Sequence, residues 1–547
     1  MEPEWRNQLY FGDNLDILRR YLADDSVDLV YLDPPFNSNA SYNVLFKEKN
    51  GTDSAAQIIA FDDFWHWDRQ AAATYQELVT QGPPKVSSLV RALHDFLGPN
   101  DMLAYLTMMA IRLVELRRVL KSTGSIYLHC DPTASHYLKM VMDAVFGCRA
   151  YRNEIIWQRT NARSTAARWP RIHDVLLHYG RTDVVTFHAV RVPGDMSRMP
   201  HHLVIGPDGS RYQTFELTGA GRTREGDSGK PWRGFDPGRM GRHWANSHAQ
   251  MDEWDAEGLI HWPANGGFPR RRGAGPFDAA QRTVVVGDLW TDIDRINQAA
   301  KERLGYATQK PEALLERIIK ASSNEGDVVL DPFCGCGTTI AVAERLHRRW
   351  IGTDITHLAI TLMKNRLQDA FGRELSPYRV IGEPQDEQSA RALAEENRFQ
   401  FEIWGLGLVG ARPAGDPQKG ADRGIDGNLY FFDDSTGKAR RCLLQVKSGK
   451  VQAPIVHALK GVMEREKAAM AALITLEEPT QPMRTEAAEA GFYQPHALVP
   501  PVPRMQILTI RDLLEGKKLE LPQAHGAATF QRAPRRQKAP RAKPAQG

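Results

Sequence analysis

Along most of the chain, segments whose apolar positions predict a strand alternate with segments whose apolar positions predict a helix. Apolar runs rich in β-branched and aromatic residues predict buried strands at residues 9–13, 27–33, 125–130, 153–157, 175–179, 327–331 and 350–354. Apolar residues at spacings of three and four predict helices at residues 15–22, 101–120, 134–146, 311–322 and 338–346, with Asp101 as the cap of the second. This alternation is typical of an α/β fold with a mostly parallel, doubly wound sheet.

Two stretches depart from the alternation. Residues 37–99 are mixed and turn-rich, and we expect them to form an excursion beside the site. Residues 190–286 are rich in Gly, Pro, Arg and Trp and show no clear period. Because long irregular stretches are usually functional or disordered, the pattern predicts one α/β domain, residues 1–189 and 287–383, interrupted by an insert at 190–286.

A second, smaller domain is predicted for residues 384–523. It begins with a helix near residues 389–404, and a polar turn at 433–438 between two apolar runs predicts a hairpin. Residues 524–547 are rich in Ala, Pro, Arg and Lys and contain no acidic residue, which predicts a disordered basic tail.

Composition limits the class of protein. Of 547 residues, 42% are hydrophobic and 25% are charged, which is ordinary for a globular protein. No apolar run approaches the roughly 18 residues of a membrane span, and the first residues lack a signal-peptide pattern. The five cysteines form no C-x-x-C pair, so neither a disulfide framework nor a zinc site is expected. These features predict a cytoplasmic protein without a membrane partner.

The net charge is only +4, but its distribution is uneven. Between Arg152 and Arg282 the positive charge is carried almost wholly by arginine, interleaved with Trp157, Trp169, Trp232, Trp244, Trp254 and Trp262. Arginine can fork onto phosphate or guanine, and aromatic rings can stack on bases. A solvated surface with amphipathic packing explains the same composition, so this segment alone does not identify nucleic acid as the partner.

A glycine turn follows the predicted strand at 327–331. The turn runs Asp331, Pro332, Phe333, Cys334, Gly335, Cys336, Gly337, Thr338 and leads into a helix with free N–H groups. Asp354 ends the next strand about 20 residues later, where an acid binds ribose hydroxyls in nucleotide-type sites. The turn lacks the Lys-Ser/Thr of a phosphate loop, and its acid suits a cofactor with a positive end, such as S-adenosyl-L-methionine.

A second turn follows the strand at 27–33 and consists of Asp33, Pro34, Pro35 and Phe36. The Asp33 carboxylate and the Pro34 carbonyl can accept the two hydrogens of an aromatic amine. This localises the nitrogen lone pair for attack on a sulfonium methyl and stabilises the positive charge that develops. The prolines rigidify the turn, and Phe36 offers a face on which an extruded base can stack. A strand-ending Asp-Pro turn without catalytic function is the simpler alternative.

Together these two turns resemble those of the DNA amino-methyltransferases. Because the catalytic turn precedes the cofactor turn, the order resembles the permuted β-type arrangement. Further matches are Gly12-Asp13, Tyr127-Leu128-His129-Cys130-Asp131, Arg152-Asn153-Glu154-Ile155-Ile156-Trp157 and Thr308-Gln309-Lys310-Pro311. The resemblance covers most of residues 5–190 and 287–370.

The resemblance implies a permuted, Rossmann-like methyltransferase sheet that binds S-adenosyl-L-methionine. Asp331, Gly335 and Gly337 would cradle the methionine part with Pro332, Phe333 and Thr338 beside them, Asp354 would bind the ribose and Asp13 the cofactor adenine. Residues 190–286 would form the target-recognition region. The partner would be double-stranded DNA with base flipping; assembly as a homodimer is left open.

Asp rather than Ser at position 33 favours adenine N6 over cytosine N4 in that family, and N4-cytosine methylation is kept as the alternative. A restriction-modification or defence role in a prokaryotic or phage setting, associated with the nucleoid, is the expected context. The competing class is a DNA-binding protein whose catalytic sites are relics.

The C-terminal domain resembles the Mrr-like restriction endonuclease fold, a smaller α/β PD-(D/E)XK nuclease-like domain. Asp426 starts one strand of the predicted hairpin, and Gln445 and Lys447 share a face of the other. Nuclease chemistry needs a carboxylate for Mg²⁺ and a lysine that orients water or stabilises charge. Asp426 and Gln445 are the candidate metal ligands and Lys447 the candidate lysine, with Glu402 as a second carboxylate. Because Gln445 stands where relatives have Glu, an inactive DNA-binding or packing domain is the alternative.

Overall fold

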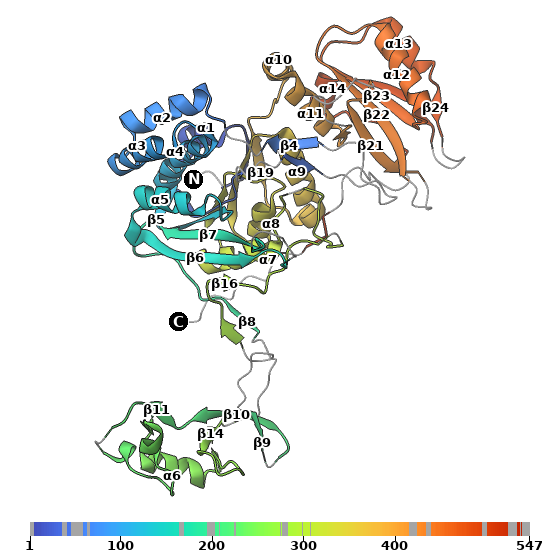
Figure 1. Ribbon diagram of the computed structural model, residues 1–547. Helices are drawn as coiled ribbons and strands as arrows, with labels where there is room; N and C mark the ends of the chain where they lie inside the picture. Colours follow the sequence, from blue (N-terminus) through green and yellow to red (C-terminus); the bar gives the residue numbers. More distant parts are fainter. Residues whose placement is uncertain are drawn as a thin grey trace. The chain divides into compact units, whose positions relative to one another are not determined.

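The computed structural model describes the chain except residues 1–4, 36–40, 45–57, 63–65, 163–168, 194–202, 207, 224–225, 274, 276–282, 298, 307, 415–423, 434–438, 495–499, 523–532, 537 and 539–547. At 41–44 and 58–62 only the backbone is described. The chain divides into two compact units, one formed by Met1–His188 and Gly287–Gly547 and the other by Ala189–Val286 (Figure 1).

A nine-stranded sheet forms the centre of the first unit. Its strand order is β16-β6-β7-β5-β2-β17-β18-β1-β19, and every pairing is parallel except those of β7 with β5 and β6. This confirms the predicted mostly parallel α/β sheet. The strands are β1 (Asn7–Phe11), β2 (Val27–Leu32), β5 (Leu120–Cys130), β6 (Tyr151–Gln158), β7 (His173–Gly180), β16 (Leu289–Trp290), β17 (Val328–Asp331), β18 (Arg349–Asp354) and β19 (Tyr378–Ile381).

The pairing of β2 with β17 positions the site. Leu29 and Val30 lie opposite Val329 and Leu330, and all four side chains are fully buried. Because the strands are parallel, their carboxyl ends meet at one edge of the sheet, where ligands bind in open α/β folds. The two turns predicted to carry the chemistry therefore leave the sheet side by side.

Helices surround the sheet, and their apolar residues lie toward the core. They are α1 (Asn14–Tyr21), α2 (Arg69–Gln81), α3 (Pro84–Leu97), α4 (Asp101–Val119), α5 (Ser135–Phe146), α7 (Glu312–Ser322), α8 (Thr338–Arg345) and α9 (His357–Phe371). Among the described residues, no helix is both long and apolar enough to cross a membrane.

Two helix predictions were wrong in detail. The cap of α4 is Asn100, whose side chain accepts a hydrogen bond from the Leu103 N–H, while Asp101 lies in the first turn, where its charge suits the helix dipole. Residues 69–97 form α2 and α3 rather than turns. The Gly82-Pro83 junction interrupts their apolar spacing, which explains why the sequence pattern appeared irregular.

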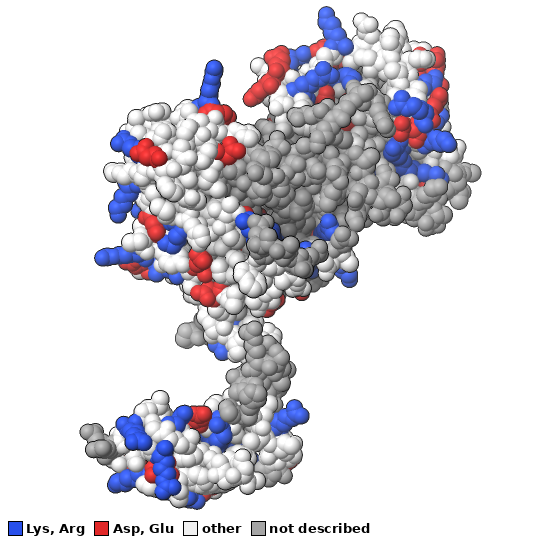
Figure 2. Space-filling model, viewed as in Figure 1, with Lys and Arg blue, Asp and Glu red and all other residues white. Residues whose placement is uncertain are grey.

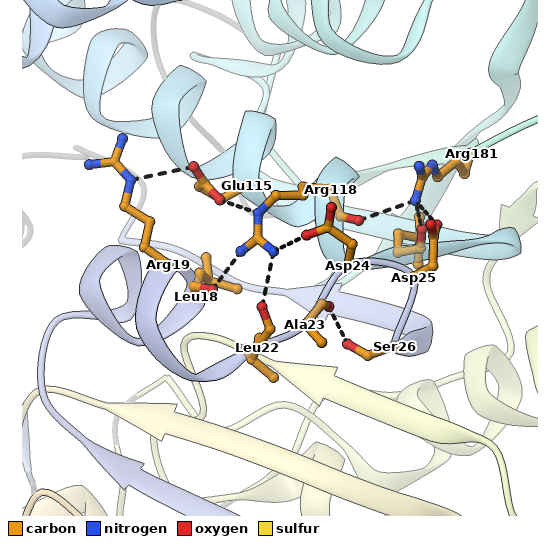
Figure 3. A network of polar contacts seen from close by, with 11 residues as sticks. Leu18, Arg19, Leu22, Ala23, Asp24, Asp25, Ser26, Glu115, Arg118 and Arg181 are labelled. Carbon is orange, nitrogen blue, oxygen red and sulfur yellow. Dashed lines mark hydrogen bonds and ion pairs between the residues drawn. The ribbon is translucent and has the colours of Figure 1, made fainter.

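Arginine side chains fix the turn that joins α1 to β2 (Figure 3). Arg118 donates to the Leu18 carbonyl at 2.6 Å and to the Leu22 carbonyl at 3.0 Å, and it pairs with Asp24 and Glu115. Arg181 donates to the carbonyl of Leu120 and pairs with Asp25. These bonds satisfy carbonyls at the end of α1, the helix that Asp13 caps at its other end.

The unit Ala189–Val286 has its own small core. Its strands are β8 (Arg191–Pro193), β9 (Leu203–Ile205), β10 (Arg211–Glu216), β11 (Thr218–Ala220), β12 (Arg242–Trp244), β13 (Ile260–His261), β14 (Arg270–Arg272) and β15 (Thr283–Val285), with helix α6 (His248–Ala256). The core consists of Leu217, Trp232, Trp244, Met251 and Ile260. Elements this short give no visible period, which is why the sequence appeared irregular here.

The C-terminal residues of the first unit contain a five-stranded sheet in the order β20-β21-β22-β23-β26. These strands are β20 (Arg412–Pro413), β21 (Gly427–Phe432), β22 (Ala439–Lys447), β23 (Met470–Thr475) and β26 (Met505–Thr509), and β21 and β22 form the predicted antiparallel hairpin. The helices are α10 (Glu387–Glu396), α11 (Arg398–Leu408), α12 (Ala453–Arg465), α13 (Gln481–Ala488) and α14 (Ile510–Leu514).

The single helix expected near residues 389–404 was wrong. Asn397 takes an extended conformation, ends α10 and caps α11 by accepting from the Gln400 N–H at 3.0 Å. An asparagine that competes for backbone hydrogen bonds favours such a break.

Part of the tail is ordered, contrary to the expectation of disorder. The Arg536 N–H donates to the Ala370 carbonyl at 2.8 Å. Lys538 pairs at 3.0 Å with Glu344, a carboxylate buried in the α/β core. Burial leaves Glu344 in need of polar partners, and Lys538 supplies one of them.

Candidate functional site

A cavity of about 300 Å³ lies at the carboxyl edge of the central strands. Its lining comes from residues 12–14, the turns after β2, β17 and β18, the segment before α7, and Arg112 of α4. Pockets for small ligands begin at roughly this size. The predicted residues that line it are Asp13, Asp33, Pro35, Asp331, Pro332, Phe333, Gly335, Thr338 and Asp354. Pro34 is buried in the same turn, Gly337 is not part of the lining, and Phe36 lies outside the described residues.

The turn after β17 needs glycine for two reasons. Gly335 and Gly337 have φ values of +52° and +74°, a region that favours glycine. A Cβ on Gly337 would lie 2.5 Å from Met363 of α9, and one on Gly335 would lie 3.0 Å from the ring of Tyr306. Gly337 thus permits close packing of α8 against α9. Gly335 leaves room for the ring of Tyr306, which also lines the cavity.

Two carboxylates lie in the lining of the cavity: Asp331, which is buried, and Asp354, which is half-buried. Burial raises the pKa of Asp331 to about 7 against hydrogen bonds from Thr339 and the Phe333 N–H, which lower it. Burial likewise raises the pKa of Asp354 to about 6, although Thr356 and the Gly335 N–H donate to it. Carboxylates desolvated in this way favour a ligand with a positive group or with hydroxyl donors.

Asp13 is held by an arginine that the sequence analysis missed. Arg112, with 4% of its side chain exposed, lies 2.9 Å from the Asp13 carboxylate and also donates to Asn14 Oδ1 at 2.6 Å. Asp13 also accepts the Leu15 N–H at 2.7 Å, as the cap of α1. Arg112 lies in the middle of α4, where an isolated arginine carries no motif. Its apolar neighbours alone suggested that α4 is buried.

The two oxygens of Asp33 differ in their surroundings. Its Oδ2 pairs with Lys310, another residue that the sequence analysis gave no role. Its Oδ1 is buried and, within the described ranges, accepts no hydrogen bond. A buried acceptor without a donor is costly and rare in native proteins. The carboxylate is therefore arranged to receive a donor from a ligand in the cavity.

The residues proposed for nuclease chemistry lie together in the C-terminal sheet. Asp426 accepts the Val446 N–H at 2.7 Å and lies 3.7 Å from Lys447 Nζ. Gln445 lies on β22 and is 9% exposed. Burial, followed by the charge of Asp426, raises the pKa of Glu402 on α11.

This donor set fits Mg²⁺ poorly. In the part of the chain that the structure describes, no three His, Cys, Asp or Glu side chains converge as a metal site. Asp426 already serves a backbone N–H, Gln445 is neutral, and Glu402 pairs with Arg398 at 3.2 Å. Mg²⁺ prefers carboxylate oxygens and substrate phosphates, so the predicted metal role of Asp426 and Gln445 gains no support from this geometry.

Comparison with known proteins gives two family matches. The family described as DNA methylase matches residues 27–365, and the family described as NACHT-associated inactive Restriction Endonuclease 1 matches residues 409–499. The Type II methyltransferase M.EcaI of Enterobacter cloacae is 25% identical over 369 residues, which cover 67% of this chain and 70% of that protein. The DNA adenine methyltransferase YhdJ of Escherichia coli is 49% identical over 86 residues, 16% of this chain and 29% of that protein.

Among solved structures, a putative DNA modification methylase from Thermus thermophilus, complexed with S-adenosyl-L-methionine, is similar to this chain. It is 16% identical with a TM-score of 0.31, and the match covers 69% of this chain and 99% of that one.

Proposed function

We propose that this chain, which belongs to the DNA methylase family, transfers a methyl group from S-adenosyl-L-methionine to the exocyclic N6 amine of adenine in double-stranded DNA. The observation that carries the proposal is the buried Oδ1 of Asp33, an acceptor without a described donor, in a residue that lines the same cavity as Asp331 and Asp354. An amine hydrogen supplies the donor that Asp33 lacks.

The cavity residues fit the cofactor. The ammonium of the methionine part suits Asp331, the ribose hydroxyls suit Asp354, and the left-handed turn at Gly335 lets backbone approach the ligand. When bound, S-adenosyl-L-methionine supplies an electrophilic methyl group on a sulfonium centre. Asp13 would contact the adenine of the cofactor and keep its ion pair with Arg112.

Asp33 and Pro34 would prepare the target nitrogen. The ion pair with Lys310 holds Oδ2 of Asp33, a residue of the cavity lining, and leaves Oδ1 for the target amine. Oδ1 and the Pro34 carbonyl then accept the two amine hydrogens, which localises the lone pair and stabilises the developing positive charge. Because the Asp33 side chain is only 14% exposed, a base stacked in a duplex cannot reach it, and the base must be flipped out.

Adenine is favoured over cytosine by Asp at position 33 and by the likeness to a protein named a DNA adenine methyltransferase. N4-cytosine methylation is the alternative, since the same two acceptors can hold either amine. The likeness to a protein named the Type III restriction-modification enzyme StyLTI Mod subunit supports a restriction-modification setting for the proposed activity.

The unit Ala189–Val286 is proposed to read the DNA target. Figure 2 shows Lys and Arg side chains over its visible surface. On β14, Arg272 lies 4.5 Å above the ring of Tyr212 and Arg271 lies 4.3 Å from the ring of Trp254. Of all described carboxylates, none pairs with either guanidinium. Stacked, uncompensated arginines are preorganised for phosphates or guanine edges.

The C-terminal domain is proposed to act without cutting DNA. The family that it matches carries the word inactive in its description, and its donor set has a neutral Gln445 where a carboxylate would hold Mg²⁺. This adopts the alternative that the sequence left open, in preference to Mg²⁺-dependent cleavage.

Replacement of Asp33 by alanine should reduce methyl transfer at least about 100-fold, because the amine loses its charged acceptor. Cofactor affinity should stay near wild type, since Asp33 does not hold the cofactor. Transfer of labelled methyl groups to DNA and calorimetric titration with the cofactor measure the two effects, with the exposed Asp183→Ala as control. Mass spectrometry of the nucleosides separates N6-methyladenine from N4-methylcytosine. A near-normal rate in D33A would refute the assignment.

Cofactor affinity should rise with pH between about 5.5 and 7.5. Asp331 has a raised pKa of about 7, so it is largely protonated at the lower limit. A cationic ligand stabilises the ionised form, so binding should release a proton and tighten by up to about tenfold per pH unit below that pKa. Calorimetry in two buffers of different ionisation enthalpy counts the protons. Asp331→Asn should bind weakly with a flatter pH dependence; affinity that rises on acidification would contradict the role.

Replacement of Arg272 by alanine should weaken binding to target DNA by about 5- to 100-fold, equivalent to the loss of one good guanidinium contact of roughly 1–3 kcal/mol. The 87%-exposed Arg239 of the same unit gives the control Arg239→Ala. Fluorescence anisotropy at fixed salt measures the affinity. Equal affinity of both variants would remove Arg272 from the DNA surface.

Incubation of plasmid DNA with the wild-type protein, Mg²⁺ or Mn²⁺ and the cofactor should give no double-strand cleavage. Unmodified and premethylated plasmids are both needed, because methylation can decide which DNA is cut. Cleavage by the wild type that disappears in Lys447→Ala would show that the nuclease-like site is active after all.

A further inference from the structure

A buried chain of polar side chains lies behind Asp33. His129 of β5 is fully buried. Its Nδ1 lies 2.9 Å from the Tyr31 hydroxyl and 3.9 Å from Asp33 Oδ1, and its Nε2 lies 3.2 Å from Asp174 Oδ2 on β7. Asp174 in turn faces Arg159 at 3.5 Å, whose side chain is 47% exposed. The chain thus connects the reaction centre to a residue in contact with solvent.

The partners of His129 fix its tautomer. Burial alone would raise the pKa of Asp174, but the hydrogen bond from His129 and the charges of Lys310 and Arg159 lower it, so Asp174 is ionised. A carboxylate only accepts, so Nε2 carries the hydrogen. Burial and the charges of Asp33, Asp331 and Asp174 raise the pKa of Tyr31 well above its ordinary value, so its hydroxyl stays protonated and donates to Nδ1. In this tautomer the lone pair of His129 lies at Nδ1, the nitrogen nearest Asp33, where it accepts from Tyr31.

We propose that His129 is a positioning residue that takes over, at Nδ1, the proton that Asp33 receives from the methylated amine. The proposal rests on the methyl-transfer function above. The unpartnered Oδ1 of Asp33 is the same oxygen that lies 3.9 Å from Nδ1. Such contacts are commonly long in ligand-free enzymes and shorten in the reactive complex.

The transfer balances as follows in atoms and charge. The amine N–H bond breaks, its electron pair stays on the now-methylated nitrogen, and the proton goes to Asp33 Oδ1. That O–H bond then breaks as the proton passes to the lone pair of His129 Nδ1, while the Tyr31 hydroxyl turns to accept from Nδ1–H. The result is an ionised Asp33 and an imidazolium, which loses its proton to solvent before the next turnover.

The surroundings favour this direction of transfer. Imidazole is intrinsically a stronger base than a carboxylate. The ammonium of Lys310, paired with Asp33, stabilises the carboxylate that the transfer restores. Asp174 stabilises the imidazolium from the opposite side, as the aspartate does in a catalytic triad.

The groups that face His129 come from several elements. Tyr31 and Asp33 belong to β2 and the turn after it, Asp174 to β7, and the uncharged ring of Trp157 to β6. Lys310 and Arg159 act one residue further out, through Asp33 and Asp174 respectively. Two carboxylates are thus balanced by two cations, and His129 is the group between them that can change charge.

The test is the pH profile of the methyl-transfer rate at saturating cofactor and DNA, where cofactor affinity no longer contributes. Wild type should lose rate at low pH as the imidazole becomes protonated. His129→Gln should be about 100-fold slower near neutral pH. It should also lack the fall in rate at low pH, the acidic limb of the profile. Asp174→Asn should keep the limb but move it to lower pH, because the imidazolium loses its carboxylate.

His178→Gln is the matched control. His178 lies on β7, is 2% exposed and stacks on Tyr127. Burial, with a smaller effect of Arg152, lowers its pKa to about 3, so it stays neutral over the range measured. Its replacement should disturb packing to a similar extent but leave the acidic limb in place.

The outcomes separate the two proposals. A His129→Gln enzyme with a wild-type rate, or a slow one that retains the wild-type acidic limb, overturns the proton-transfer role and leaves the proposed function intact. If H129Q does not fold, an unchanged limb in Asp174→Asn overturns it instead. A folded wild-type protein that methylates no DNA overturns the proposed function and this inference with it.

Discussion

The site depends on the parallel pairing of β2 with β17. These strands come from opposite ends of the α/β domain, yet their register places Leu32 and Asp331 at the same edge of the sheet. The segment before α7 joins them there, where Lys310 meets Asp33 across 277 positions of sequence. The parallel pairing therefore places both turns at the same cavity. The backbone hydrogen bonds of the sheet maintain this geometry without a ligand.

The carboxylates held at that edge are costly without a cationic partner. Desolvation raises the pKa of Asp331 to about 7 and that of Asp354 to about 6, so the folded protein binds more protons there than the unfolded chain. Their contribution to stability is therefore present below the unfolded pKa near 4 and is lost as pH rises toward 6 and 7. A cation bound between them reverses this loss. If the proposed function holds, desolvation of Asp331 and Asp354 lowers the stability of the ligand-free domain at neutral pH, and the same desolvation strengthens the attraction of these carboxylates for the cofactor.

The sequence predicted the sheet and both turns because each is a local pattern: an apolar run followed by Asp-Pro or by a glycine turn. It could not identify Arg112 or His129 as partners of Asp13 and Asp33, since each lies in a buried element where its contact is made across the fold. Single polar residues decided the errors at helix ends: Asn100 rather than Asp101 caps α4, and Asn397 divides α10 from α11. In the unit Ala189–Val286, tryptophan packing between very short strands leaves no period to detect.

The two potential catalytic centres differ in how their charges are balanced. Near His129, Asp33 pairs with Lys310 and Asp174 faces Arg159, so the proposed proton transfer leaves each carboxylate beside a cation. Around Asp426, the carboxylate accepts a backbone N–H and lies beside Lys447, Glu402 is paired with Arg398, and Gln445 adds no charge. A divalent cation placed there would meet Lys447 with too few carboxylates to offset it. The neutral Gln445, in place of a Glu, therefore weakens a metal-dependent centre directly. The centre at Asp33 needs no metal, because its own residues carry both signs of charge. This is the physical reason to expect methylation, rather than cleavage, from a chain that carries both folds.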